Sequence, residues 1–284
     1  MSRCTPGRAL LLGAFFLFGS AAPGISGAGD EGCGAPQSPC VVDGGEYYAA
    51  LPEAAASPPA VIWLHGYARS GKAMIQNPDY VSPFTRRGYA VIMPTGQPWP
   101  GSGDLDWGVV DGHGLPRDDV AFVQAVRADA VARFGLDPSR ILLAGFSRGG
   151  SMVWDIACRA PASATAFAAV SGAFWEPFPA DCAGPVDLFH THGFKDRLVP
   201  FEGRDVTFAG FDFTQGNVMK GIDIWRRRNG CRGSARNSLG EDGAMQKDWT
   251  ECAAGSIRLR LTTGGHGVPA GWRDAVLDWF EALS

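Results

Sequence analysis

Short, continuous apolar runs recur along this chain and alternate with longer amphipathic segments. Runs of this length are typical of strands that are buried on both faces of a parallel sheet. They cover residues 60–64, 89–94, 141–144, 167–170 and 186–190. Segments with helical spacing lie at 73–88, 118–134, 221–228 and 275–280. The pattern predicts an α/β fold in which helices cover both faces of a mostly parallel central sheet.

Two segments depart from this alternation. Residues 257–261 alternate apolar and charged side chains, which indicates a last strand near the sheet edge. Residues 95–115 form a long stretch rich in Gly, Pro, Asp and Trp. Loops longer than about 12–15 residues are uncommon in compact domains and are often functional, so we expect this stretch to contribute to a functional site.

One apolar run leads directly into a motif with chemical meaning. Residues 141–144 precede Gly145-Phe146-Ser147-Arg148-Gly149, and residues 151–158 have helical character. A Gly-x-Ser-x-Gly sequence between a strand and a helix predicts a tight turn that exposes a nucleophilic serine. We therefore predict that Ser147 is catalytic. The alternative is a glycine-rich turn whose serine only caps the helix.

A serine nucleophile needs a histidine base and an acid that orients the base. Where the serine lies on this kind of turn, the acid and then the histidine follow it along the chain. We predict that His266, between glycines after the last strand, is the base. Asp196 lies just beyond a predicted strand, where active sites of such sheets collect, and we predict that it is the acid rather than a solvated turn residue. His190 and His192 are expected to be structural.

Backbone donors and aromatic side chains complete the expected site. An oxyanion hole needs two N–H groups aimed at the developing charge. We expect these from Arg148, directly after the serine, and from Tyr67, in the loop after 60–64. Tryptophans in loops beyond strands can hold an aromatic or polymeric acyl group, and the candidates are Trp99, Trp107 and Trp175. Core packing is the alternative, above all for Trp107.

The N-terminus has the layout of a secretory signal peptide. Arg3 and Arg8 precede an apolar segment at 9–18, and small residues follow as far as Ala28. We therefore divide the chain of 284 residues into a signal peptide, 1–28, and a single catalytic domain, 29–284. The apolar segment is too short to span a bilayer. We expect a secreted protein, extracellular or periplasmic, without a stable membrane anchor.

Cysteine usage and charge add to this picture. The sequence has seven cysteines, and six remain once Cys4 is removed with the predicted signal peptide. An even number of cysteines in an exported chain predicts disulfides. Sequential pairing is the simplest connectivity and joins Cys33 to Cys40, Cys158 to Cys182, and Cys231 to Cys252. The spacing of these cysteines does not indicate a metal site. The net charge of −4 argues against a nucleic-acid partner, because phosphate binding requires a basic surface.

Short motifs spread over most of the chain resemble those of secreted α/β-hydrolase esterases, the LpqC-like family that groups poly(3-hydroxybutyrate) depolymerases with feruloyl esterases. They are Leu64-His65-Gly66-Tyr67, Pro94-Thr95-Gly96, Asp106-Trp107-Gly108, Asp118-Asp119-Val120-Ala121-Phe122, Asp137-Pro138-Ser139-Arg140, Gly145-Phe146-Ser147-Arg148-Gly149-Gly150, His192-Gly193-Phe194-Lys195-Asp196, Asn229-Gly230-Cys231 and Gly264-Gly265-His266. The resemblance implies an α/β-hydrolase fold, a Ser147–Asp196–His266 triad, no cofactor, and ester hydrolysis through an acyl-enzyme.

The sequence as a whole therefore predicts a secreted serine carboxylic-ester hydrolase that acts on polyhydroxyalkanoate-type or feruloyl and other aryl esters. The expected partner is a small or oligomeric ester, and the expected state is a monomer. A serine peptidase of the same fold is the alternative, because acyl transfer from esters and peptides uses the same groups. A non-catalytic binding protein on this fold is a second alternative, although such a protein would be expected to lose Ser147 or His266.

Overall fold

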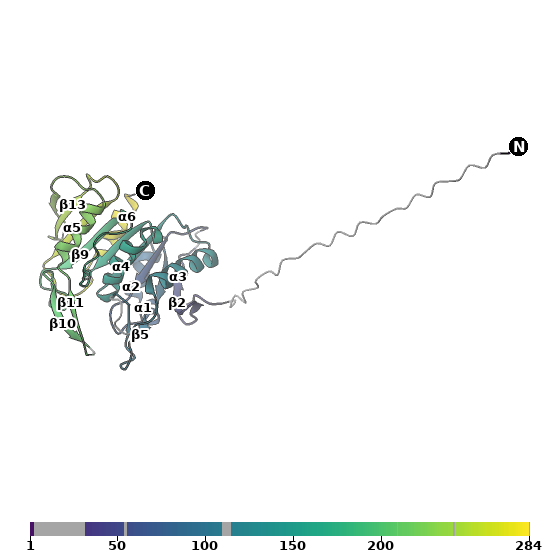
Figure 1. Cartoon of the computed structure of the whole chain (residues 1–284), viewed down its shortest axis with the longest axis horizontal. Helices are drawn as coiled ribbons and strands as arrows, with labels where there is room; N and C mark the ends of the chain where they lie inside the picture. The colour runs from purple at the N-terminus through teal and green to yellow at the C-terminus, as the bar shows by residue number, and fades with distance from the viewer. Residues whose placement is uncertain (3–31, 54–55, 110–114, 209, 241, 284) are drawn as a thin grey trace. The chain divides into compact units, whose positions relative to one another are not determined.

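The computed structural model describes residues 1–2, 32–53, 56–109, 115–208, 210–240 and 242–283. Gly32–Ser284 forms one compact unit, and Figure 1 shows its central sheet with helices on both sides. Most of the predicted signal peptide, 1–28, and its cleavage site fall on residues 3–31, outside the described part of the chain. The division of the chain at residue 28 therefore stays a prediction.

A ten-stranded sheet runs through the described part of this unit. Its neighbours from β4 to β14 pair in parallel, whereas the two outer strands on each side pair antiparallel. The predicted mostly parallel sheet is confirmed. In spatial order the strands are β1 (Cys40–Val42), β2 (Gly45–Ala50), β4 (Ala90–Pro94), β3 (Ala60–Leu64), β7 (Ile141–Phe146), β8 (Ala166–Val170), β9 (Asp187–Gly193), β14 (Ser256–Thr262), β13 (Met245–Trp249) and β12 (Arg236–Leu239).

Helices cover the two faces of the sheet because successive strand residues point to opposite sides. Ile62 belongs to one buried cluster and its neighbour Trp63 to the other. The first cluster lies under α3 (Asp119–Phe134), α4 (Arg148–Arg159) and α5 (Val218–Arg228). The second lies under α1 (Gly71–Ile75), α2 (Pro78–Thr85) and α6 (Trp272–Glu281). A short 3-10 turn, η1, spans Pro161–Ser163.

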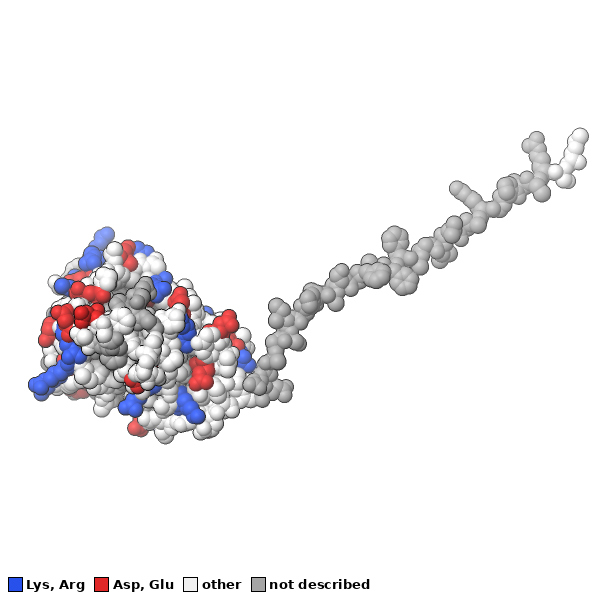
Figure 2. All heavy atoms as spheres, turned by 60° about the horizontal axis from the view of Figure 1, so that its bottom comes forward, with Lys and Arg blue, Asp and Glu red and all other residues white. Residues whose placement is uncertain are grey.

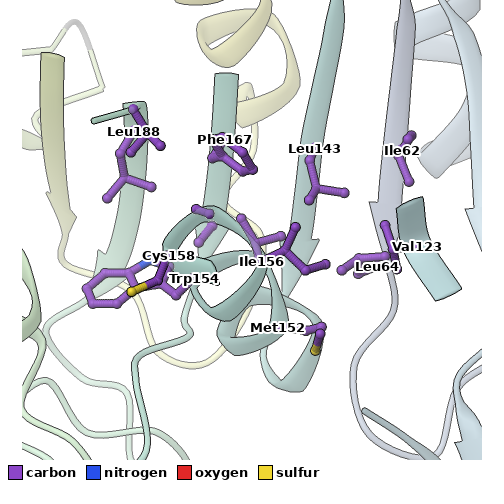
Figure 3. Close-up of a cluster of buried hydrophobic side chains, with 14 of the residues drawn as sticks. Ile62, Leu64, Val123, Leu143, Met152, Trp154, Ile156, Cys158, Phe167 and Leu188 are labelled. Carbon is purple, nitrogen blue, oxygen red and sulfur yellow. The ribbon is translucent and has the colours of Figure 1, made fainter. Parts of the chain in front are cut away.

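Helix α4 is held firmly against the sheet. Figure 3 shows Met152, Trp154, Ile156 and Cys158 on this helix beside apolar strand residues such as Phe167. All are at most 4% exposed, and burial of one large apolar side chain contributes about 1.5–3 kcal/mol. The helix therefore provides a rigid base for the turn that precedes it.

Two expectations about the elements need correction. Residues 257–261 do lie in a strand, but β14 is an internal strand with β13 and β12 beyond it. Its charged positions are satisfied inside the sheet, since the Arg258 Nε donates to Asp248 Oδ1 on β13 at 2.6 Å. The long stretch 95–115 also contains a small hairpin, β5 (Gln97–Pro98) with β6 (Leu105–Asp106).

Three disulfides join the six cysteines of the described chain in the sequential pairing, Cys33–Cys40, Cys158–Cys182 and Cys231–Cys252. Among the described residues, every helix is too short or too polar to cross a membrane. On the face drawn in Figure 2, the acidic and basic side chains are interspersed.

Candidate active site

Ser147 lies at the sharp turn between β7 and α4. Its backbone has φ +57° and ψ −121°, a conformation that is strained for a residue with a side chain. A Cβ at Gly145 would lie 2.5 Å from the Gly149 carbonyl oxygen, and one at Gly149 would lie 2.1 Å from the Leu64 oxygen. The turn thus needs glycine at both positions because backbones approach closely there, which presents the serine hydroxyl beyond the sheet.

His266 joins Ser147 to Asp196. The His266 Nε2 lies 2.9 Å from Ser147 Oγ, and its Nδ1 lies 2.8 Å from Asp196 Oδ2. Since a carboxylate accepts, the Nδ1 carries the proton and the Nε2 accepts from the serine hydroxyl. The parallel pairing of β9 with β14 brings the loops that carry Asp196 and His266 to the same edge of the sheet.

The environment of Asp196 keeps its carboxylate ionised. Its Oδ1 accepts from the backbone N–H groups of Leu198 at 3.0 Å and Val199 at 2.9 Å. Burial alone would raise the pKa of this carboxyl, but the hydrogen bonds from His266 and Val199 outweigh burial and hold the pKa below its usual range. A buried, ionised carboxylate at this point fixes the tautomer of His266.

The other two histidines on β9 form a buried pair beneath this turn. The His192 Nε2–H donates to the Val199 carbonyl at 2.8 Å, and the His190 Nε2–H donates to His192 Nδ1 at 3.1 Å. Burial lowers the pKa of both imidazoles, so the pair is neutral. Among the described residues, neither imidazole hydrogen bonds to Ser147, and their structural role stays a prediction.

A third buried histidine links the loops on the other side of the serine. The His65 Nδ1–H donates to the Gly66 carbonyl, and its Nε2 accepts from the Gly96 N–H, both at 2.8 Å. Burial lowers the pKa of His65 to about 4. A Cβ at Gly66 would lie 3.4 Å from the Ser147 Cβ, so this loop packs directly against Ser147. Tyr67 follows it and lines the cavity.

The side chain of Arg148 is held beside the serine by three contacts. Its Nε donates to Asp106 Oδ1 at 2.8 Å, and its Nη2 donates to the Trp107 carbonyl at 2.9 Å. Its guanidinium carbon lies 4.6 Å from the ring centre of Trp175. The Arg148 N–H opens α4, and the first N–H groups of a helix have no carbonyl partner within it. These groups and the helix dipole favour negative charge.

A cavity of about 370 Å³ opens onto Ser147 and His266. Its aromatic walls include Trp99, Trp175 and Phe213. The Phe213 ring centre lies 5.6 Å from that of Trp175 and 6.5 Å from that of Trp99. The cavity is thus a mainly apolar, aromatic slot with the serine hydroxyl at its wall, the size and character expected of a small-molecule site.

A hairpin supplies one side of this cavity. It consists of β10 (Arg204–Phe208) and β11 (Phe211–Gln215), and in Figure 1 it extends beyond the same end of the sheet as β5. The hairpin is docked on the chain after β8, where the Glu176 N–H donates to the Thr214 carbonyl at 2.8 Å. No group of three or more His, Cys, Asp or Glu side chains suited to a metal ion occurs among the described residues.

Comparison with known proteins identifies the family. A family model described as phospholipase/carboxylesterase matches residues 49–209, more than half of the chain. The chain belongs to this family. It is a carboxylic ester hydrolase, and the α/β-hydrolase fold is confirmed.

Individual relatives agree with this assignment. The esterase is 26% identical over 281 residues to feruloyl esterase C of Emericella nidulans, with 93% of each chain covered. It is 29% identical over 251 residues to the putative esterase NocK of Nocardia uniformis subsp. tsuyamanensis, with 80% of this chain and 70% of NocK covered. The resemblance to an esterase family stated from the motifs is therefore confirmed.

A solved structure shows the same fold. The acetyl xylan esterase from Aspergillus awamori superposes with a TM-score of 0.59 at 15% identity, covering 83% of this esterase and 93% of that chain. At this identity the likeness concerns the fold alone.

The structure of the esterase brings most of the predicted site residues together. Ser147, Asp196 and His266 form one hydrogen-bonded series, and Trp99 and Trp175 line the cavity beside them. Trp107 is the exception, because it is fully buried and its indole N–H donates to the His65 carbonyl at 2.8 Å. Trp107 therefore supports the loop at residue 65, which is the core-packing alternative given for it above, and it is not a candidate for substrate contact.

Sequence reasoning missed hairpin β10–β11 of the esterase. The signal was present, because apolar and polar residues alternate in 205–208 and again in 211–214, on either side of Gly210. Gly210 has φ +81°, as tight hairpin turns require. What the pattern alone did not indicate is that one face of the hairpin closes over a serine more than 50 residues earlier in the chain.

Proposed function

We propose that this esterase cleaves its substrate through an acyl-enzyme formed on Ser147. The observation that carries the proposal is the series from Asp196 through His266 to a serine on a strained turn. His266 takes the proton of the Ser147 hydroxyl as the oxygen attacks the ester carbonyl, and then passes it to the leaving alcohol. A water molecule, deprotonated by the same ring, attacks the acyl-enzyme and releases the acid.

The tetrahedral intermediates of this reaction carry a negative oxygen. We assign its stabilisation to the backbone N–H groups of Arg148 and Tyr67. The position of Arg148 at the start of α4 supports the first assignment. The contact of the preceding residue, Gly66, with Ser147 supports the second.

The cavity favours an aromatic acyl group as the substrate of the proposed reaction. Rings of Trp99, Trp175 and Phe213 offer faces and edges to a planar group whose ester carbonyl lies at Ser147. The similarity to a protein named feruloyl esterase C supports the same choice. Polyhydroxyalkanoate-type esters, which the sequence also predicts as substrates, stay a prediction, and the substrate panel described below tests it. The family assignment favours an ester bond over the peptide bond of the alternative reading.

Export is proposed together with this activity. The layout of residues 1–28 is that of a signal peptide, and the three disulfides of the described chain are typical of proteins outside the cytosol. A monomer remains the expected state.

The decisive experiment replaces the proposed nucleophile. Ser147→Ala should lower kcat/KM on methyl ferulate by at least about 10⁴-fold, because triad members act as a unit. An aryl phosphonate should label the wild type at Ser147, as located by mass spectrometry. Ser139→Ala is the matched control, since Ser139 is an exposed serine just before the other end of β7.

A panel of four substrates, assayed with the wild type and both variants, distinguishes the substrate classes. It includes nitrophenyl acetate, methyl ferulate, hydroxybutyrate oligomers and a peptide nitroanilide. Near wild-type ester hydrolysis by Ser147→Ala would refute the acyl-enzyme on this residue. Wild-type turnover of the oligomers or the anilide with none of methyl ferulate would refute the aromatic acyl group.

A further inference from the structure

We propose that Arg204 forms a subsite for the far end of the acyl group, and that preferred substrates carry an oxygen acceptor there. The acceptor is a phenolic or ether oxygen, or a second carboxylate. This inference rests on the proposed function and deepens it, because it adds a polar requirement to the aromatic acyl class.

The hairpin register directs Arg204 toward the cavity. Arg204 is paired with Gln215, and Val206 with Phe213. Pairs two residues apart share a face of a two-stranded ribbon, and all four of these residues line the cavity.

The opposite face of the hairpin is polar and self-paired. The Thr214 hydroxyl donates to Asp205 Oδ1, and the Thr207 hydroxyl donates to Asp212 Oδ1, both at 2.7 Å. The acidic side chains of the hairpin are thereby bound on the face away from Arg204. The pleat of the hairpin, rather than the flexibility of a surface side chain, thus places this guanidinium at the cavity wall.

The charge of Arg204 is not neutralised within the described chain. Its Nε donates to Gln215 Oε1 at 3.1 Å, but no carboxylate of the described residues lies within ion-pairing distance of its nitrogen atoms. Among the described residues that line the cavity, the carboxylate is that of Asp106, and it is already paired with Arg148. The guanidinium of Arg204 therefore keeps donors and positive charge for a ligand.

The position of Arg204 relative to Ser147 determines which part of a bound acyl group its guanidinium can contact. Ser147 and Arg204 border the same cavity, and the ring of Phe213, on the hairpin, packs against Trp175 in its wall. An acyl group that places its carbonyl at Ser147 and its ring against Phe213 directs its far end to the hairpin. Arginine binds oxygen acceptors there through planar, charge-assisted hydrogen bonds.

The test compares three methyl esters on one skeleton: methyl cinnamate, methyl ferulate, and the monomethyl ester of 4-carboxycinnamic acid with its distal carboxyl free. Arg204→Gln should change kcat/KM least on methyl cinnamate, which has no distal acceptor. It should lower kcat/KM on the carboxylated ester about 3- to 10-fold, mainly through KM, because an exposed charge pair contributes modestly and uniformly to binding. Methyl ferulate should lose about 2- to 3-fold, since its acceptor is neutral.

A matched variant tests whether the effect is specific to Arg204, and a salt series tests whether it is electrostatic. Arg227→Gln removes an equally exposed arginine on α5, away from the cavity, and should change none of the three ratios. Raising NaCl from about 0.05 to about 1 M shortens the Debye screening length from roughly 14 Å to about 3 Å, and should shrink only the advantage of the carboxylated ester. Melting temperatures of both variants check that the hairpin stays folded.

Each outcome decides something. Loss on the carboxylated ester alone identifies an anionic end group, and loss on methyl ferulate alone identifies a neutral one. Identical substrate ratios in wild type and Arg204→Gln would overturn the subsite while the cinnamoyl activity of Ser147 stands. If the wild type cleaves nitrophenyl acetate but none of the three cinnamoyl esters, the aromatic part of the proposed function fails, and the subsite fails with it.

Discussion

Two regions of this esterase meet at one cavity and are built differently. The first, the catalytic edge, consists of the loops after β7, β9 and β14, which carry Ser147, Asp196 and His266. The second, the aromatic wall, consists of hairpin β10–β11 with Trp99 and Trp175. The catalytic edge continues directly from parallel strands in the core, whereas the aromatic wall is a separate two-stranded unit docked on the surface.

The difference separates chemistry from selectivity. The catalytic edge is rigid because buried strands and backbone hydrogen bonds fix each of its side chains. A change there should lower the rate on every ester by a similar factor. In the proposed binding mode the aromatic wall contacts the acyl group, so a change there should mainly alter the ratio between esters. The predictions below test this contrast.

The largest effect is expected at the acid of the catalytic edge. Asp196→Asn keeps the shape of the side chain but favours the wrong tautomer of His266. By analogy with the aspartate of serine proteases, kcat should fall about 10⁴-fold, by the same factor on nitrophenyl acetate and methyl ferulate. Steady-state kinetics on both esters measures this.

The control for this loss is a neighbour in the same hydrogen-bond system. His192 donates to the Val199 carbonyl and lies 3.8 Å from Asp196 Oδ2. His192→Gln keeps a donor and should cost about 10-fold or less, because only the turn around Asp196 is loosened. Equal losses in the two variants would contradict the assignment of Asp196 as the orienting acid.

The catalytic edge could be predicted from sequence because its signals are local. Gly145, Ser147 and Gly149 specify a turn whose geometry requires glycine, and the apolar runs at β7 and β9 give the direction of their strands. Because the strands are parallel, their C-terminal ends meet at one edge of the sheet. The acid and the base must follow Ser147 along the chain, which leaves only a small number of candidates. These signals depend little on distant parts of the chain.

The aromatic wall could not be predicted in the same way. Arg204 and Phe213 face the cavity only because the hairpin docks against residues 174–176, a contact between segments that no local pattern encodes. The sequence left the role of Trp107 open between substrate contact and core packing for the converse reason. Nothing in the sequence of its loop distinguishes an indole that hydrogen bonds to the His65 carbonyl from one that faces solvent.

His65 connects the two regions, since it links the loop at Gly66 to Gly96, just before Trp99. Its pKa is lowered to about 4, so between pH 6.5 and 4 the unfolded chain binds a proton that the folded chain does not. The free energy of unfolding should therefore fall as pH falls through this range, by about 3 kcal/mol from His65 alone. Urea unfolding at pH 7 and at pH 4.5 measures the loss.

A variant isolates this contribution from those of His190 and His192, whose pKa values are also lowered by burial. His65→Gln retains a donor and an acceptor but does not titrate. It should be less stable than the wild type at pH 7, and should lose less stability on acidification. An identical pH dependence in the two proteins would show that His65 is not buried in the neutral form.

The smallest effect is expected at the aromatic wall, and it is the one that distinguishes the regions most sharply. The Phe213 ring packs against Trp99 and Trp175 and faces the cavity. Phe213→Ala should lower kcat/KM on methyl ferulate about 3- to 10-fold, the magnitude of one aromatic contact. Activity on nitrophenyl acetate should stay within about 2-fold, because a two-carbon acyl group does not reach the ring.

Phe211→Ala is the matched control on the same strand. Phe211 is 40% exposed and does not line the cavity, and it meets the wall through ring contacts with Trp99 and Phe213. Its removal should therefore change the ferulate-to-acetate ratio less than Phe213→Ala does. A uniform loss on both esters in Phe213→Ala would mean that the wall supports the catalytic edge as well as the substrate. The contrast between a region for chemistry and a region for selectivity would then fail, because a change in the aromatic wall would also alter the geometry of the catalytic edge.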